Sequence, residues 1–189
     1  FLSIAALCIC FGVLRQTRHL INQPLGYNMD GIVCVDFAGQ NENILYDELK
    51  TLSFIEKVAL YQTLPTTKIM TSIEDDKGHR KRIYMIQGTK EYLDILGIQI
   101  LEDYGIATVD PEEGRYYVCN SSLSALRPYM QEGNIRMYHP QPLCGVVSDF
   151  KLGDLKESDL GKITLASIIS EDISLKFGCN IIAKVNIDE

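Results

Sequence analysis

Residues 143–155 read LCGVVSDFKLGDL, and this stretch contributes most to the expected fold. Its first half is apolar and rich in β-branched residues, which predicts a strand over Leu143–Phe150. Asp149 interrupts the apolar run directly before Phe150. We expect its carboxylate either to cap a local turn through its own backbone or to make a specific contact at a moving interface. The stretch therefore predicts a buried strand that ends at a polar corner.

Further strands are expected on both sides of this segment. The clearest is Gly31–Phe37 (GIVCVDF), which is apolar on both faces and is therefore expected to be central. Near the C-terminus, alternation predicts a half-exposed strand with Ile181, Ala183, Val185 and Ile187 on one face. The other expected strands cover Val58–Thr63, Lys68–Ile73, Arg82–Gln87 and Arg115–Cys119.

Short helices are expected between these strands. Leucines spaced along one face predict a helix over Asn43–Ser53. A second helix is expected to begin after Thr89, a favourable N-cap residue, and to end at Gly97. Ser121 is expected to cap one or two turns that end before Pro128. Strands and helices mix without regular βαβ alternation, so the predicted fold class is α+β with a mixed, mostly antiparallel sheet.

The chain opens with an apolar run. Residues 1–14 read FLSIAALCICFGVL, with no charge before Arg15. A helix of that length spans about 21 Å, short of the ~30 Å hydrocarbon core of a bilayer. We expect residues 1–23 to be the outer end of a first transmembrane helix and a stalk, with a buried core helix as the alternative. Residues 24–189 are then expected to form the core domain. A division of this domain, with an inserted lobe over about residues 76–141, is left as an alternative.

Composition restricts the class of protein. The 189-residue chain has a formal net charge of −7, with 46% hydrophobic and 23% charged residues. These values are typical of an ordinary globular protein and exclude intrinsic disorder and a polytopic membrane protein. Phosphate-backbone binding needs clustered lysine and arginine, and the sequence offers no basic face. Nucleic acid is therefore not an expected partner.

The cysteines and histidines do not predict a metal site. Cys8 and Cys10 lie in the apolar run, and four further cysteines are scattered through strand-like stretches: Cys34, Cys119, Cys144 and Cys179. None shows zinc-ligand spacing. We expect these four to be buried free thiols, with disulfide pairing in an oxidising compartment as the alternative. The histidines are expected at the surface, and no metal or cofactor is expected.

The sequence carries no familiar catalytic motif. The phosphate-binding loop, the dinucleotide fingerprint, the H-E-x-x-H zinc motif and the G-x-S-x-G elbow are all absent. Glu74, Asp75 and Asp76 precede Lys77-Gly78, which favours a solvated hairpin turn over a cation site. From its residues, the chain is not expected to be an enzyme.

Three segments together resemble a known family. Gln16 and Leu25-Gly26-Tyr27 precede the strand Ile32–Val35, Tyr92–Leu101 has the form Y-x-x-x-x-G-I-x-I-L, and Gly145–Leu155 has the form G-V-V-x-D-F-x-x-x-x-L. In this order they resemble the ectodomain of a MacB/FtsX-type ABC-transporter permease, of the divergent type common in Bacteroidetes.

The resemblance implies a non-catalytic extracytoplasmic domain between the first two membrane helices of a permease. A separate cytoplasmic ATPase would hydrolyse ATP, and this domain would relay the motion of the membrane helices to the periplasm, for export (efflux), lipoprotein release or signalling. The implied location is the periplasmic side of the bacterial inner membrane. The implied partners are the ATPase subunit, a second permease copy and a periplasmic adaptor or outer-membrane protein. The alternative is a membrane-anchored module that binds a ligand or peptide.

The resemblance also implies which residues act as structural levers. Five would form the stalk and its turn into the core: Gln16, Arg18, Pro24, Gly26 and Tyr27. Four further positions belong to the family's structural motifs: Gly97, Gly145, Asp149 and Phe150.

Overall fold

The computed structural model describes residues 11, 13–15, 25–35, 42–67, 69–106, 114–152, 162–172, 174 and 179–186. These residues form an α+β fold around one 11-stranded mixed sheet with short helices, which confirms the predicted class. Neighbouring strands run in the order β1-β11-β2-β4-β10-β6-β9-β8-β7, with β3 added to β4 and β5 added to β9. All pairings are antiparallel except β4 with β10 and β6 with β9.

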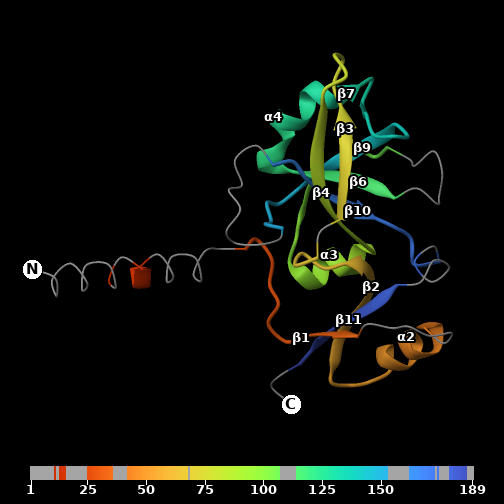
Figure 1. The fold of residues 1–189 in the computed structure, drawn as a ribbon. Helices are drawn as coiled ribbons and strands as arrows, with labels where there is room; N and C mark the ends of the chain where they lie inside the picture. Colours follow the sequence, from red (N-terminus) through yellow and green to blue (C-terminus); the bar gives the residue numbers. More distant parts are fainter. Residues whose placement is uncertain are drawn as a thin grey trace, which may run out of the picture.

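The lower half of the sheet in Figure 1 carries a helix on each face. The strands of this lower half are β1 (Ile32–Val35), β11 (Asn180–Val185) and β2 (Ile55–Thr63). Helix α2 (Glu42–Lys50) packs Tyr46 and its leucines against one face of β2 and β11. Helix α3 (Lys90–Leu96) packs against the other face. This half therefore has a core on each side of the sheet.

Strand β4 (Arg80–Gly88) joins the two halves of the sheet. Its end at Gln87 and Gly88 pairs with β2, whereas its first six residues pair with β3 (Ile69–Glu74). On its other edge it pairs in parallel with β10 (Thr164–Ile168). As a result, β2 and β3 lie along the same edge of β4, interrupted near Leu64-Pro65.

The upper half contains the remaining strands and the short helical turns (Figure 1). Strand β6 lies between β10 and β9, and β5 adds to β9 at the opposite edge. Their bounds are Ile100–Asp103 for β5, Arg115–Cys119 for β6, Met130–Gln131 for β7, Asn134–Ile135 for β8 and Gln141–Val147 for β9. Helical turns span residues 120–129 and include α4 (Leu123–Leu126).

Two strands occupy different places from those predicted. The strand beginning at Ile32 was expected to be central, but β1 lies at one end of the sheet and pairs only with β11 among the described residues. Its residues are apolar on both faces because Ile32 and Cys34 pack on the α3 side and Val35 packs on the α2 side. Conversely, β11 was expected to be half exposed, yet Ile181 and Ile182 are both fully buried.

Several local predictions also need correction. The strand predicted over Leu143–Phe150 ends at Val147. Thr89 occupies the N-cap position of α3, but its hydroxyl makes no capping bond and is buried without a hydrogen-bond partner. Pro128 lies inside a short 3-10 turn instead of after the helix. Strand β10, completely missed by the sequence pattern, is one of the most deeply buried strands.

The N-terminal predictions concern residues that are mostly not described. Phe11 and Val13–Arg15 are helical and exposed, while Gln16, Arg18 and Pro24 lie outside the described residues. No helix within the described part of the chain is long and apolar enough to cross a membrane. The division at residue 23 and the inserted lobe over about residues 76–141 stay predictions.

Candidate functional site: the junction of residues 25–28 with the sheet

Residues Leu25–Asn28 bind to the body of the domain through their backbone. The carbonyl oxygen of Leu25 accepts a hydrogen bond from the N–H of Lys151 at 2.9 Å. The N–H of Asn28 donates to the carbonyl oxygen of Leu96, the last residue of α3, at 2.8 Å. We call residues 25–28, with the segments that they contact, the junction. Both ends of this four-residue segment are therefore attached to the domain, one near β9 and one at α3.

Gly26 is required at the junction for two reasons. Its φ angle of +75° lies in the left-handed region, which costs any residue with a Cβ atom. A Cβ atom at this position would also stand 2.0 Å from the carbonyl oxygen of Asp149 and 2.8 Å from Cα of Phe150. The backbone of residue 26 thus lies directly against the Asp149-Phe150 corner, closer than any side chain permits.

The Asp149-Phe150 corner is itself held by neighbouring segments. Oδ1 of Asp149 accepts a hydrogen bond from the N–H of Ser121 at 2.7 Å, so the carboxylate contacts another segment and does not cap its own turn. The preceding Ser148 exchanges bonds with Gln99: its N–H donates to the Gln99 carbonyl at 2.8 Å, and its Oγ accepts from the Gln99 N–H at 3.0 Å. Phe150 is 5% exposed and packs in the core on the α3 side of the sheet, which we call the main core.

Gly97 and Tyr27 complete the contact with α3. Gly97 ends α3 as expected, in the left-handed conformation with φ = 73° and with its N–H donating to the carbonyl of Asp94. Nothing lies within 4 Å of a Cβ at this position, so its conformation and not its size explains the glycine. Tyr27 packs against the main core, and its partial burial raises the pKa of its hydroxyl.

Gly145 has a different role, farther along β9. A Cβ atom there would stand 2.1 Å from the carbonyl oxygen of Glu102 on β5. The register between β5 and β9 shifts between Ile100 and Glu102, which brings the two backbones close at this point. Gly145 therefore permits the β5–β9 pairing.

Several residues singled out in the sequence lie at this junction, whereas the residues that hold it in place were not among them. The three segments that carry the family resemblance meet at the junction: Leu25–Tyr27, the end of α3 at Leu96-Gly97, and Asp149-Phe150. Ser121, Gln99 and Asn28 were not predicted as site residues, because each takes part through a backbone N–H, which any residue except proline supplies.

A pocket of about 360 Å³ opens beside the junction. Its lining includes Gly26, Asp149 and Phe150, together with Cys119 on β6 and Lys162 before β10. Burial raises the pKa of the Cys119 thiol to about 12, so this thiol is protonated at neutral pH and is a poor nucleophile. The four cysteines at 34, 119, 144 and 179 are all free thiols. Within the described ranges, no three His, Cys, Asp or Glu residues are placed to hold a metal ion.

Comparison with solved structures identifies the fold. The periplasmic region of MacB from Actinobacillus actinomycetemcomitans matches with a TM-score of 0.53 and 15% identity, over 90% of this chain and 81% of that one. The extracellular domain of the ABC-type transporter YknZ from Gram-positive bacteria matches with a TM-score of 0.52 and 11% identity, over 83% and 84%. A permease-protein domain from Porphyromonas gingivalis matches with a TM-score of 0.54 and 12% identity, over 88% and 78%.

The fold is that of an ABC-transporter permease ectodomain. The resemblance noted in the sequence is thereby confirmed at the level of the fold. Comparison with protein-family models and with curated proteins finds no match. At 11–15% identity the fold is shared while most side chains differ, so the contacts of the junction come from this chain alone.

Proposed function

We propose that this chain is the non-catalytic extracytoplasmic domain of an ABC-transporter permease. In this proposal a separate cytoplasmic ATPase subunit hydrolyses ATP, and the domain relays the motion of the membrane helices to the periplasm. The permease functions as a pair of copies in the inner membrane, with a periplasmic adaptor or outer-membrane protein as a further partner. The permease-ectodomain fold supports the class of protein, and the junction supports the relay.

The relay proposal is supported most directly by the hydrogen bonds that attach residues 25–28 to the domain at both ends. A displacement of the preceding chain would be passed to α3 through the Asn28–Leu96 hydrogen bond and to the segment that follows β9 through the Leu25–Lys151 bond. A flexible linker would absorb such a displacement, because its end-to-end distance adjusts without deforming either attachment. Here Gly26 lies against the Asp149 backbone and leaves no room for such adjustment.

The test places a single cysteine at Gln16 or Arg18 in the membrane-embedded permease with its ATPase and with the native cysteines replaced. Crosslinking between the two copies is then measured with and without ATP. Nucleotide-dependent yield supports the relay. A yield that ignores nucleotide, together with a ligand that binds the domain, would support the anchored binding module instead.

A matched pair of glycine variants tests the junction in the same assay. Gly26→Ala introduces both a positive-φ penalty and a collision with Asp149, whereas Gly105→Ala has a similar φ (+67°) and open space around its Cβ. We expect Gly26→Ala to abolish the nucleotide dependence and Gly105→Ala to leave it intact. Equal behaviour of the two variants would show that junction contact is not needed for coupling.

A further inference from the structure

Strand β3 has one paired edge and one open edge. Residues Ile69–Glu74 pair with β4 in continuous antiparallel register, and no other strand of the described residues pairs with β3. The strand reads IMTSIE, without the lysine or proline that commonly protects an edge. Met70 on this strand is 55% exposed. The part of this edge at Met70 and Ser72 is therefore open to pairing with another strand.

The hydrogen bonds show which backbone groups of β3 point outward. The N–H of Glu74 donates to the carbonyl oxygen of Arg136, away from β4, at 3.1 Å. Backbone groups alternate in direction along a strand, so Met70 and Ser72 also direct their N–H and C=O away from β4. Tyr84, the β4 partner of Met70, agrees with this register, because its N–H donates away from β3 to the carbonyl of Ile163 at 3.0 Å.

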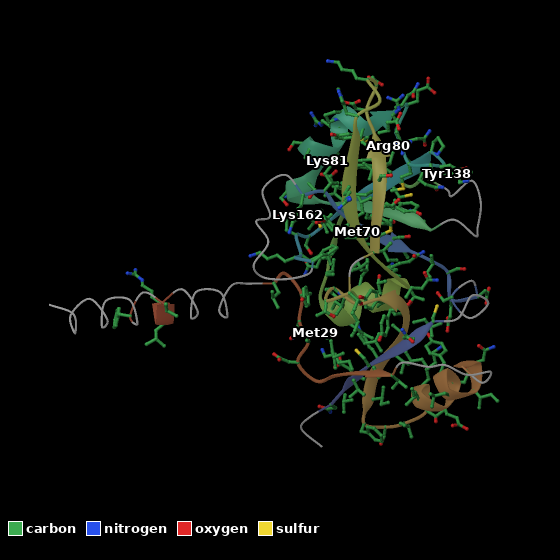
Figure 2. All side chains as sticks on the ribbon, viewed as in Figure 1. Met29, Met70, Arg80, Lys81, Tyr138 and Lys162 are labelled. Carbon is green, nitrogen blue, oxygen red and sulfur yellow. The ribbon has the colours of Figure 1, made fainter. Side chains whose placement is uncertain are left out.

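A groove of about 600 Å³ lies beside the Ser72–Glu74 end of β3, and Arg80 of β4 also lines it. Ser72 and Glu74 line one side, while Arg136, Met137, Tyr138 and Pro140 are among the residues of the facing wall. Tyr138 is 93% exposed. Figure 2 shows Arg80 and Tyr138 in the upper half of the molecule, whereas Met29, next to the junction, lies in the lower half. The volume is within the range of about 300–1,000 Å³ that is usual for ligand sites.

We propose that this groove binds an extended peptide segment of another protein, which adds as a strand to the outer edge of β3. The backbone of the peptide pairs with the outward groups of Met70 and Ser72, and the Glu74–Arg136 bond closes one end of the groove. Apolar peptide side chains on one face contact Met137, Tyr138 and Pro140. This interaction surface goes beyond the relay and does not depend on it.

The wall of the groove favours one strand over a second copy of the chain. In a pair of β3 strands from two copies, β4 of the second copy would follow directly behind its β3. The wall at residues 136–140 lies across the groove from β3, where that β4 would have to fit. A single extended segment needs only the space of one strand, about 4.8 Å from β3.

The test uses a phage-displayed library of random heptapeptides, selected on the full 189-residue chain in detergent. The most frequent peptide is synthesised with a fluorescein label, and its affinity is measured by anisotropy. Ser72→Pro removes an outward N–H that the β3–β4 ladder does not use, so the hairpin is retained. Ser72→Ala is the matched control, because it removes the hydroxyl and keeps the N–H.

We expect Ser72→Pro to weaken binding by about tenfold or more, because it removes a hydrogen bond and blocks the edge of the strand. We expect Ser72→Ala to bind within about twofold of wild type. In the wild-type chain, bound peptide should slow hydrogen exchange at the N–H groups of Met70 and Ser72, a readout that holds even if the proline variant unfolds. Failure to select a peptide, or unchanged exchange at these two amides, overturns the proposal. So does a wild-type dimer that Ser72→Pro converts to a monomer, because a second copy then occupies the edge.

Discussion

The junction and the tip of the β3–β4 hairpin belong to one sheet but are stabilised by different interactions. At the junction, backbone lies against backbone, with Gly26 on Asp149 and the Phe150 side chain 5% exposed. At the hairpin tip, an ion pair joins Glu74 to Arg80 and a hydrogen bond joins Asp75 to the His79 ring, with the Arg80 and His79 side chains 77% and 72% exposed. Exposed ion pairs contribute about 0–1 kcal/mol each, far less than a buried aromatic side chain.

This difference indicates which region can tolerate change. Close backbone approaches leave few alternative residues, so the junction requires glycine and a buried aromatic residue at particular positions. The tip requires a turn and solvated charge, which many sequences supply. A relay of motion needs close backbone contacts such as those at the junction. A surface that adapts to a partner can be built on a solvated turn such as the hairpin tip.

The largest expected effect on stability comes from Phe150, the buried aromatic residue at the junction. Phe150→Ala removes a buried side chain from the main core and should lower the free energy of unfolding by about 3–5 kcal/mol. Arg80→Ala, at the hairpin tip with a side chain that is 77% exposed, should change it by no more than about 1 kcal/mol. Urea unfolding followed by circular dichroism measures both. Similar losses for the two variants would contradict the distinction between the regions.

The next largest effect concerns the hydrogen bond between Asp149 and the N–H of Ser121. Asp149→Ala leaves the N–H of Ser121 without its carboxylate partner and should cost about 1–2 kcal/mol of unfolding free energy, since Ser121 is exposed enough for water to replace part of the bond. Asp149→Asn keeps an acceptor oxygen at the same place and should recover most of the loss. An asparagine variant as unstable as the alanine variant would show that the negative charge matters more than the hydrogen bond.

The sequence predicted individual turns and helix ends well because their signals are local. Gly97 ends α3 as the glycine pattern indicated, and the turn at Asp75–Gly78 forms where the acidic cluster and glycine predicted it. The family resemblance singled out Asp149 and Phe150, the two residues that lie against Gly26. Each of these features depends on a few neighbouring residues.

The sequence could not predict the order of the strands. Strand β10 reads TLASI, a short run with two hydroxyl residues, and its burial results from pairing with β4 and β6 from distant parts of the chain. Strand β1 is apolar on both faces because a core covers each face, not because strands flank both edges. A side-chain pattern reports which faces are covered and carries no information on edges.

A smaller effect separates strained backbone from close approach. Gly78 has φ = +79°, and the nearest atom to its Cβ position is a side-chain oxygen of Glu74 at 3.8 Å. Gly78→Ala should therefore cost only the positive-φ penalty, about 1 kcal/mol in urea unfolding. Gly26→Ala carries the same penalty and the collision with Asp149, so it should cost more. If the two variants lose equal stability, the short approach at Gly26 is relieved without cost.

The smallest effect is a pH dependence at the hairpin tip. The N–H of His79 donates to Oδ1 of Asp75 at 2.8 Å, and this bond, with those from the His79 ring and the Lys77 N–H, lowers the pKa of Asp75 below its ordinary value of 3.8. A lowered pKa in the folded state means that the unfolded chain binds the proton more readily. The stabilisation from Asp75 is therefore complete above the unfolded pKa and is lost as the pH falls from there through the folded pKa. Asp75→Asn should flatten this part of the acid dependence and leave stability at neutral pH nearly unchanged, since solvent at the hairpin tip screens this carboxylate. NMR titration of the Asp75 carboxyl carbon gives the folded pKa directly, and a midpoint at or above 3.8 would contradict the bonding assigned to the turn.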